Sequence, residues 1–348
     1  MACQWPQGAK RNPSELPRQR LQPAGPTARA LDIHWPCKAA LVRVKIATLE
    51  ENPWNHAEFA AYEGLAARDR IGQHHLERDP DKADLIVFVD LHQRPHDPEL
   101  KALREHVLVR RYPDRVRVID IRDRPHWTFP GVYVSWTRGR RGSGTVEGGC
   151  YPTLLTPAEP TGAAPDLLYS FCGARTHSIR DKLLEARSSR AVVVDTTEQS
   201  PFAGEALDLS DAAQDRYKEL LSRSKFVLCP RGHGPSTFRL YECLSAGRVP
   251  VILSDAWVPP RDVDWSSCAL RLAERGADRI DEFLEQMEPM WPTLAAGAQR
   301  VWNDHFAPDV RWHHLISAVG RTSGRLRIPW LQYELLRRRA LAAVGRAA

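Results

Sequence analysis

Two arginines and a carboxylate stand close together in the segment Ser224–Asp255, which reads SKFVLCPRGHGPSTFRLYECLSAGRVPVILSD. An apolar run leads into a loop rich in Gly and Pro, and the loop opens into a predicted helix. Arg231 lies in the loop, and Arg239 and Glu242 lie three residues apart on one face of the helix. Guanidinium groups form charge-assisted hydrogen bonds with phosphate, whereas a carboxylate accepts hydrogen bonds from sugar hydroxyls. The combination is suited to a nucleotide with a diphosphate.

The loop itself favours an anion. Gly232 and Gly234 allow the backbone to approach a bound group closely, because they carry no Cβ. We predict that Ser236 or Thr237 is the N-cap of the helix and that Gly247 follows its last turn as the C′ residue. This arrangement would direct unpaired N–H groups and the positive end of the helix dipole towards a phosphate.

A purely structural interpretation stays open at this level. Gly-rich loops before helices are common, and Arg239 with Glu242 could be a solvated i,i+3 pair. The loop matches neither the phosphate-binding pattern GxxxxGK[ST] nor the dinucleotide pattern GxGxxG. Spacing alone therefore leaves ligand binding and a structural loop as alternatives.

The amino-acid composition limits the classes of protein to which the chain can belong. The chain has 348 residues, with 49 Lys and Arg against 43 Asp and Glu, which gives a net charge of +6. The basic residues are scattered rather than gathered into a stripe with aromatics, so we expect no nucleic-acid partner. The 7 cysteines are far apart and include no CxxC pair, which predicts reduced thiols. We find no apolar core of a signal peptide and no apolar run of membrane-spanning length.

Hydrophobic periodicity predicts two α/β series in tandem. Residues 1–38 are polar and rich in Pro, which indicates a flexible leader. Residues 39–165 alternate strands and helices as one Rossmann-like domain, although 122–166 shows little regular pattern. Residues 166–324 repeat the alternation, and 325–348 form a basic amphipathic helix that closes the chain. Ligands in such folds bind at the carboxyl ends of the strands.

The central segment resembles the signature of the exostosin family, glycosyltransferase family 47. The matching stretches are FVLCPRG, STFRLYECLSAGRVPVILSD and DVDW, with looser matches in DPDKADLIVFV, GVYVS and FCGARTHSIRDKL. Together they extend from about Leu41 to Glu274. The resemblance implies a GT-B fold, in which two Rossmann-like domains face each other across a cleft. It also implies a nucleotide-sugar donor on the C-terminal domain.

The resemblance implies roles for individual residues by position. Arg231, Ser236 and Arg239 would hold the diphosphate of the donor, and Glu242 its ribose. The full set of predicted donor-binding residues is Gly173, Arg175, Arg180, Arg231, Gly232, Ser236, Thr237, Arg239 and Glu242. For Arg175 and Arg180, a surface arginine without a ligand is the alternative.

The family's transferases are inverting, which implies one displacement at the anomeric carbon of a nucleotide sugar, here expected to be a UDP-sugar. The hexosyl or pentosyl group would pass to a hydroxyl of a glycan or small molecule. A general base should come from the N-terminal domain. Asp120, Asp123 and His126 follow the strand predicted at residues 115–121 and are the first candidates, although Asp is also a common turn residue. Glu58, Asp90, His92 and Glu147 are further candidates.

We expect no cofactor and no metal, because GT-B enzymes generally need none for catalysis. The DVD of Asp262–Asp264 resembles a manganese-binding DxD, but it falls in a loop segment of the exostosin pattern and is interpreted as structural. His74–His75 and His313–His314 are adjacent pairs whose side chains diverge on a strand or helix. We therefore predict surface histidines rather than metal ligands.

Two other classes of protein remain as alternatives. One is a catalytically inactive nucleotide-sugar-binding partner subunit of a glycan-synthesis complex. The other is an NAD-dependent Rossmann enzyme, which is disfavoured because no glycine fingerprint follows VRVKIATL. The composition favours a bacterial cytoplasmic enzyme, with the C-terminal helix either packed on the first domain or in peripheral contact with an anionic membrane.

Overall fold

Two parallel β-sheets organise the chain. The computed structural model describes residues 41–49, 53–89, 101–123, 129–137, 145–153, 164–199 and 211–323. Both sheets belong to one compact unit, residues 40–348. The predicted leader, His126 and the predicted helix at residues 325–348 lie outside the described residues.

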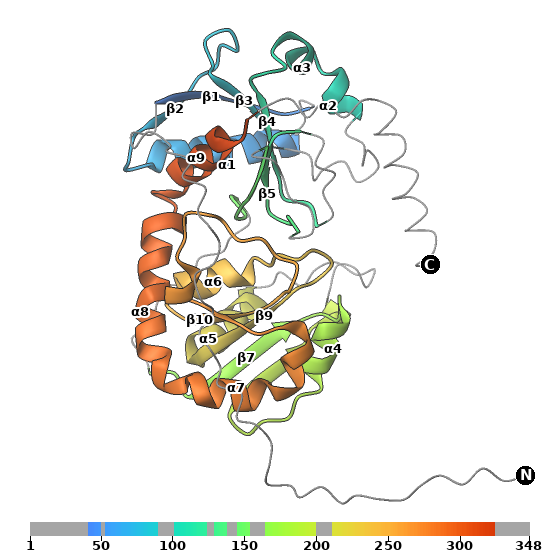
Figure 1. The fold of residues 1–348 in the computed structure, drawn as a ribbon, viewed down its shortest axis with the longest axis vertical. Helices are drawn as coiled ribbons and strands as arrows, with labels where there is room; N and C mark the ends of the chain where they lie inside the picture. The colour runs from blue at the N-terminus through green and yellow to red at the C-terminus, as the bar shows by residue number, and fades with distance from the viewer. Residues whose placement is uncertain are drawn as a thin grey trace, which may run out of the picture. The chain divides into compact units, whose positions relative to one another are not determined.

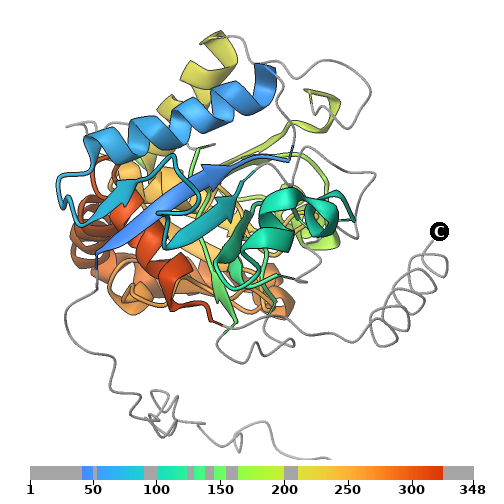
Figure 2. The same ribbon diagram turned by 90° about the horizontal axis from the view of Figure 1, so that it is seen from above.

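The first sheet has six strands in the order β2-β1-β3-β4-β5-β6, all parallel to their neighbours. Its strands and helices are β1 (Val42–Ala47), α1 (Pro53–Arg68), β2 (His74–Leu76), β3 (Leu85–Phe88), α2 (Lys101–Glu105), α3 (Val107–Arg111), β4 (Val116–Asp120), β5 (Gly131–Tyr133) and β6 (Val146–Gly148). Within β3, Leu85 and Val87 enter one hydrophobic core, while Ile86 and Phe88 enter another. A continuous apolar run forms this strand because both faces of the sheet are covered. Figure 2 shows α1 lying across the strands.

The second sheet has five strands in the order β11-β10-β9-β7-β8, again all parallel. Its elements are β7 (Leu167–Gly173), α4 (Ser178–Leu184), β8 (Ala191–Asp195), α5 (Asp211–Arg223), β9 (Ser224–Pro230), α6 (Arg239–Ser245), β10 (Val249–Leu253), β11 (Leu270–Arg271), α7 (Ile280–Met287) and α8 (Trp291–Val301). The two sheets confirm the expected pair of Rossmann-like layers of a GT-B fold.

The segment predicted to lack regular structure, residues 122–166, contributes two strands to the first sheet. Both β5 and β6 are only three residues long, so neither can show an alternation in the sequence. Between β3 and β4, the described residues form two short helices, α2 and α3. Because the composition of residues 122–166 is irregular, the sequence did not predict the strands β5 and β6 at one edge of the first sheet.

The chain returns from the second sheet to the first through its last described helix. After α8, the π-helix Trp302–Phe306 leads into α9 (Arg311–Arg321). Figure 1 shows α8 beside the second sheet and α9, in red, beside α1 at the first. The indole Nε1 of Trp312 in α9 donates a hydrogen bond of 3.1 Å to the carbonyl oxygen of His74 in β2. The predicted domain boundary at residue 324 groups α9 with the second series, although the helix packs on the first sheet.

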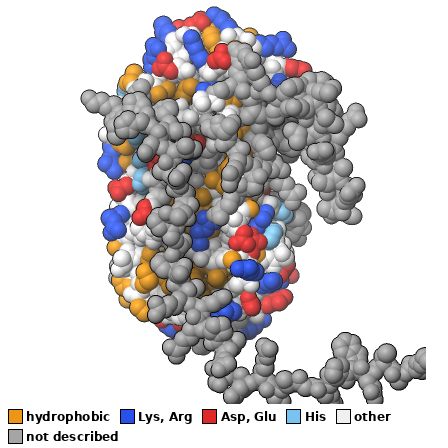
Figure 3. Space-filling model, in the orientation of Figure 1, with side chains coloured by type: hydrophobic (Ala, Val, Ile, Leu, Met, Phe, Trp, Pro, Cys, Tyr) orange, Lys and Arg blue, Asp and Glu red, His pale blue; other side chains and the backbone are white. Residues whose placement is uncertain are grey.

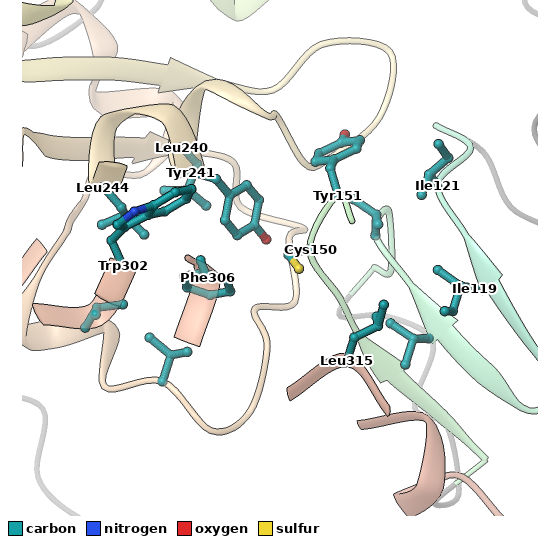
Figure 4. Close-up of a cluster of buried hydrophobic side chains, with 14 of the residues drawn as sticks. Ile119, Ile121, Cys150, Tyr151, Leu240, Tyr241, Leu244, Trp302, Phe306 and Leu315 are labelled. Carbon is teal, nitrogen blue, oxygen red and sulfur yellow. The ribbon is translucent and has the colours of Figure 1, made fainter. Parts of the chain in front are cut away.

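One hydrophobic core joins the two sheets. It contains Ile119 of β4 and Val227 of β9, with Tyr241, Phe306 and Leu315 between them. Figure 4 shows these aromatic and aliphatic side chains lying between the two halves. The Tyr241 hydroxyl also donates a hydrogen bond of 3.1 Å to the carbonyl oxygen of Gly149. The carboxyl ends of the second sheet are thus held in a defined position relative to the loops of the first.

The surface agrees with the scattered charge of the sequence. On the face in Figure 3, the coloured basic and acidic side chains are intermixed. No helix in the described ranges combines the length and the apolar character needed to cross a membrane.

The prediction of surface histidines is correct for the exposed His75 but wrong for the buried His74, and His313 and His314 are half-buried. His74 is only 4% exposed, and its ring stacks on that of His313 with centroids 5.0 Å apart. The half-buried His314 lies 4.6 Å from His305, and its ring Nε2 is 2.7 Å from the carbonyl oxygen of Asp304. The rings of His313 and His314 also make an edge contact, with centroids 5.1 Å apart, and each of the two meets a further histidine from another element. Burial, reinforced by neighbouring imidazoles, lowers the pKa of His74 and of His314 to about 4.

This cluster predicts loss of stability on mild acidification. Because the folded-state pKa of His74 lies below its unfolded value, the unfolded chain binds more protons as the pH falls from 7 towards 4. We expect His74 to contribute a decrease of about 1–3 kcal/mol in the free energy of unfolding over this range. Urea unfolding at several pH values should give a shallower pH dependence for His74→Gln, while His75→Gln at the exposed neighbour keeps the wild-type slope. An unchanged slope in His74→Gln would contradict the assignment.

Candidate functional site

The strand order of the second sheet places a crevice at the carboxyl ends of β7 and β9. From β7 the chain passes through α4 to β8, and α5 then carries it back across β7 to β9 on the other side. The two helices cover opposite faces, since α4 packs in one core and α5 in the other. The loops after β7 and β9 therefore diverge, which is where ligands bind in open α/β sheets.

Two arginine side chains, Arg180 and Arg239, converge on this point at the ring of Phe171. The guanidinium carbons of Arg180 and Arg239 lie 5.9 and 5.1 Å from the ring centroid. Arg180 donates through Nε to the carbonyl oxygen of Arg231 at 2.9 Å, and Arg239 donates through Nη2 to that of Cys172. These acceptors are neutral carbonyl groups. Burial and the like charge of Arg239 lower the pKa of Arg180, so the site would gain from an added negative charge.

Several hydrogen-bond donors at this point lack a partner. Within the described part of the chain, the buried Nε of Arg231 and the buried Nε and Nη1 of Arg239 make no hydrogen bond. The same holds for the buried hydroxyl oxygens of Thr176 and Ser236. Buried donors without acceptors are costly, roughly 1–3 kcal/mol each and more when charged. An anion with several oxygens would satisfy them together.

The glycines of the crevice make room for these side chains. A Cβ on Gly232 would lie 3.0 Å from both Arg180 Nη2 and Thr176 Oγ1. A Cβ on Gly173 would lie 3.0 Å from Arg239 Nη2. The sequence-predicted residues Gly173, Arg180, Arg231, Gly232, Ser236 and Arg239 are therefore brought together.

Glu242 lies one turn after Arg239 and is 5% exposed, while Arg239 is 7% exposed. The alternative of a solvated ion pair between them is therefore wrong. The hydroxyl of Tyr217 in α5 donates a hydrogen bond of 2.7 Å to Glu242 Oε2. Burial raises the pKa of Glu242, against the opposing effects of Tyr217 and Arg239. Tyr217 thus fixes the carboxylate on the α5 side of α6.

The ends of α6 only partly match the prediction. The helix begins at Arg239, and its N-cap is Phe238, without a side-chain capping bond, so Ser236 and Thr237 are not the cap. Thr237 is buried in the preceding loop, where its carbonyl oxygen accepts from Leu240 N. The helix α6 has only seven residues, so its dipole is small. Most of the positive charge at its N-terminus therefore comes from the arginine side chains. The C-terminal prediction is confirmed, since Gly247 has a φ of +62° and ends the helix.

Loops of the first sheet meet this site at Gly234. A Cβ there would lie 2.5 Å from Asp123 Oδ1 and 2.7 Å from Ser135 Oγ, so only glycine allows this approach. Burial, with the charge of Asp123 adding to it, raises the pKa of Tyr151. Ser135 and Ser236 lie near enough to the Tyr151 hydroxyl to lower that pKa, but neither makes a hydrogen bond of good geometry. The carboxylate of Asp123 and the hydroxyl groups of Ser135 and Tyr151 therefore face the loop between β9 and α6, which carries Arg231 and Ser236.

The candidate bases differ in their surroundings. Asp120 is fully buried, and both of its oxygens accept hydrogen bonds from Arg122, the shortest at 2.6 Å. The carboxylate of Glu147 is also paired with an arginine, because it accepts two hydrogen bonds from Arg321 Nε and one from Arg321 Nη2. Asp123 lies three residues beyond the end of β4, with its carboxylate exposed beside Gly234. Among the described candidates, Asp123 is the one that the fold brings to the loop.

Other predicted residues have structural partners. Arg175 donates to Asp195 at 2.7 Å and lies 3.4 Å from Asp181, which directs its guanidinium to the ends of β8 and α4. Asp262 pairs with Arg321 at 2.7 Å, and Asp264 caps the short helix at Trp265. Both aspartates of DVD therefore have partners within the protein. No group of three potential metal ligands occurs in the described ranges.

Sequence reasoning missed four residues of the site. Thr176 lies three residues after the end of β7, and its position near a strand's carboxyl end could have indicated it. Ser135 stands at the end of GVYVS, which was noted only as a loose match. Tyr151 and Tyr217 carried no local signal, because their partners lie far away in the sequence.

Comparison with known proteins shows what the segment around this site is similar to. The Exostosin GT47 domain matches residues 156–287. An Exostosin-1 homolog of Caenorhabditis elegans is 47% identical over 70 residues, 20% of this chain and 18% of the relative. Exostosin-1 of Drosophila melanogaster is 29% identical over 185 residues, 46% of this chain and 23% of the relative. A probable glucuronosyltransferase of Oryza sativa subsp. japonica is 33% identical over 101 residues, 28% of this chain and 23% of the relative. The chain thus spans about a fifth of the length of these curated relatives.

Solved structures resemble the chain more distantly. An alpha1,3-fucosyltransferase gives a TM-score of 0.39 at 11% identity, covering 81% of this chain and 89% of that structure. The apo lipopolysaccharide outer core galactosyltransferase WaaB gives 0.42 at 8% identity, covering 80% and 99%. The fold assignment rests on the chain's own strand order. Over residues 156–287 the chain is similar to the exostosin GT47 domain.

Proposed function

We propose that the chain is an inverting glycosyltransferase that moves a sugar from a nucleotide-sugar donor to an acceptor hydroxyl. The observation that carries this proposal is a set of buried donors, from Arg231, Arg239, Thr176 and Ser236, that make no hydrogen bond within the described residues. They lie on the segments that follow β7 and β9. The match of residues 156–287 to the exostosin GT47 domain supports the proposal. A diphosphate offers enough oxygens to accept from all of these groups.

The arginines would act on the leaving group. As the bond between the anomeric carbon and the phosphate oxygen breaks, negative charge grows on the nucleoside diphosphate. The guanidinium group of Arg239 is already held by the carbonyl oxygen of Cys172, so it can stabilise this charge without rearrangement, and Arg231 would add a second positive charge. Their positive charge would take the part that a metal ion takes in other transferases. We therefore propose a metal-independent reaction, with activity unchanged by a chelator.

Asp123 is proposed as the general base. Its carboxylate would accept the proton of the acceptor hydroxyl while that oxygen attacks the anomeric carbon from the face opposite the diphosphate. The new glycosidic bond forms as the bond to the phosphate oxygen breaks, so the configuration inverts. The placement of Asp123 beside Gly234, on the loop that carries Arg231, supports this role.

The donor is proposed to be a UDP-sugar, with Glu242, held by Tyr217, as the acceptor for ribose hydroxyls. UDP-glucuronate is the first donor to test, because the rice relative is named a probable glucuronosyltransferase. The acceptor would be a glycan or a small molecule with a free hydroxyl.

The diphosphate assignment predicts a specific loss of affinity. Arg231→Gln removes a charged donor but keeps a polar side chain, and a charge-assisted hydrogen bond is worth about 1.5–3 kcal/mol. We expect the Kd for UDP, measured by calorimetry, to rise roughly 10- to 100-fold. Arg279→Gln, at an exposed arginine paired with Glu282, is the control and should bind as the wild type. Wild-type affinity in Arg231→Gln, or equal binding of uridine and UDP, would argue against the site.

The base assignment predicts a separation of binding and turnover. Asp123→Asn should lower kcat about 10²- to 10⁴-fold while UDP binding is kept, because the amide cannot accept the proton. Asp120→Asn serves as the comparison, since it breaks the buried pair with Arg122 and should lower the melting temperature. Full turnover in Asp123→Asn would exclude it as the base. UDP binding by the wild type without transfer or hydrolysis would favour the inactive partner subunit.

A further inference from the structure

Phe238 departs from the pattern of its neighbours. It is 48% exposed, whereas Thr237 and Arg239 on either side are 9% and 7% exposed. Large exposed hydrophobic residues in the described ranges are Leu41, Ile71, Val107, Val194, Phe238 and Met290, and Phe238 is the aromatic one. A phenyl ring is thus partly open to solvent between two residues of the site that are buried.

The position also departs from a rule of local structure. Phe238 is the N-cap of α6 and makes no side-chain capping bond. Ser, Thr, Asp or Asn at an N-cap stabilises a helix by roughly 0.5–2 kcal/mol relative to an apolar residue. A residue that forgoes this stabilisation and also exposes apolar surface is expected at a functional position.

The ring is held in one orientation by Tyr151 of the first half. The two ring centroids are 6.0 Å apart with an interplanar angle of 80°, an edge-to-face contact. Tyr151 is itself 6% exposed and makes a second edge-to-face contact with Tyr241 in the shared core. Figure 4 shows Tyr151 and Tyr241 between the two halves. This support fixes the phenyl ring of Phe238, although nearly half of its surface is open.

The polar groups around the ring are those that bind sugar hydroxyls. Ser236 lies two residues away in the loop, and Ser135 and Asp123 approach that loop at Gly234. The buried oxygens of Ser135 and Ser236 make no hydrogen bond within the described part of the chain. An aromatic face beside hydroxyl and carboxylate groups can contact the C–H face of a pyranose and hydrogen-bond its hydroxyls.

From this geometry we propose that Phe238 is a stacking platform for the acceptor's sugar ring and thereby determines acceptor specificity. The inference rests on the proposed function. The position of Phe238 along α6 favours a contact with the acceptor rather than with the nucleobase. Phe238 lies at the end that meets Tyr151 and the first sheet, whereas Glu242 and Tyr217, proposed for the ribose, lie one turn further on the α5 side.

The test uses methyl β-D-glucopyranoside, methyl β-D-galactopyranoside and methyl β-D-xylopyranoside as probes, with the full chain. Binding of each glycoside is followed by saturation-transfer NMR with and without saturating UDP, and UDP binding is measured on the same samples. Phe238→Tyr keeps an aromatic face, Phe238→Leu keeps apolar bulk, and Met290→Leu is an exposed control far along the sequence. We expect at least one glycoside to bind the wild type, Phe238→Tyr and Met290→Leu alike, and to bind Phe238→Leu roughly tenfold more weakly. UDP affinity should be equal in all four.

The outcomes separate this inference from the proposed function. Equal glycoside binding in Phe238→Leu, or no glycoside binding to the wild type, overturns the platform while leaving the UDP result intact. A loss of UDP affinity in Phe238→Leu overturns it in favour of a nucleobase contact. Absence of UDP binding by the wild type counts against the proposed function itself, whatever the glycosides do.

Discussion

Buried positive charge at the carboxyl ends of β7 and β9 is the constraint on which the site depends. Arg180 and Arg239 flank the ring of Phe171, and their hydrogen-bond acceptors are main-chain carbonyl oxygens. Neutral acceptors orient a guanidinium without cancelling its charge, so the cost of burial is only partly offset. An anionic ligand would complete the arrangement. A fold that evolved for stability alone would place a carboxylate there.

The buried positive charge of the arginines can act on a reacting ligand only because the loops of the first sheet, on the opposite side of the site, are held in position. A single core runs from Ile119 in the first sheet to Val227 in the second, through Tyr241 and Phe306. The return of α9 to the first sheet adds the ion pair between Arg321 and Glu147. These contacts bring Asp123 against the glycine loop, where a carboxylate can face a reacting centre beside the arginines. The chemistry proposed for the site therefore follows from packing at some distance from it.

The sequence predicted what local pattern encodes. The strand predicted at residues 115–121, which is β4, and the loop between β9 and α6 are both where they were expected, because each is specified by a few consecutive residues. The stack of His74 on His313 was not predictable, since it joins positions far apart in the chain. Likewise, Asp120 and Asp123 look alike in the sequence. Only the direction of the backbone at the end of β4 buries one and exposes the other.

The central claim is that the loop between β9 and α6, which carries Arg231, holds the diphosphate of a nucleotide. A crystal structure of the chain with UDP tests this claim most directly. The account predicts phosphate oxygens within hydrogen-bond distance, about 3 Å, of Arg231 and Arg239 and of the hydroxyl of Thr176 or Ser236. Density for UDP elsewhere on the protein, with these donors still unpaired, would contradict it.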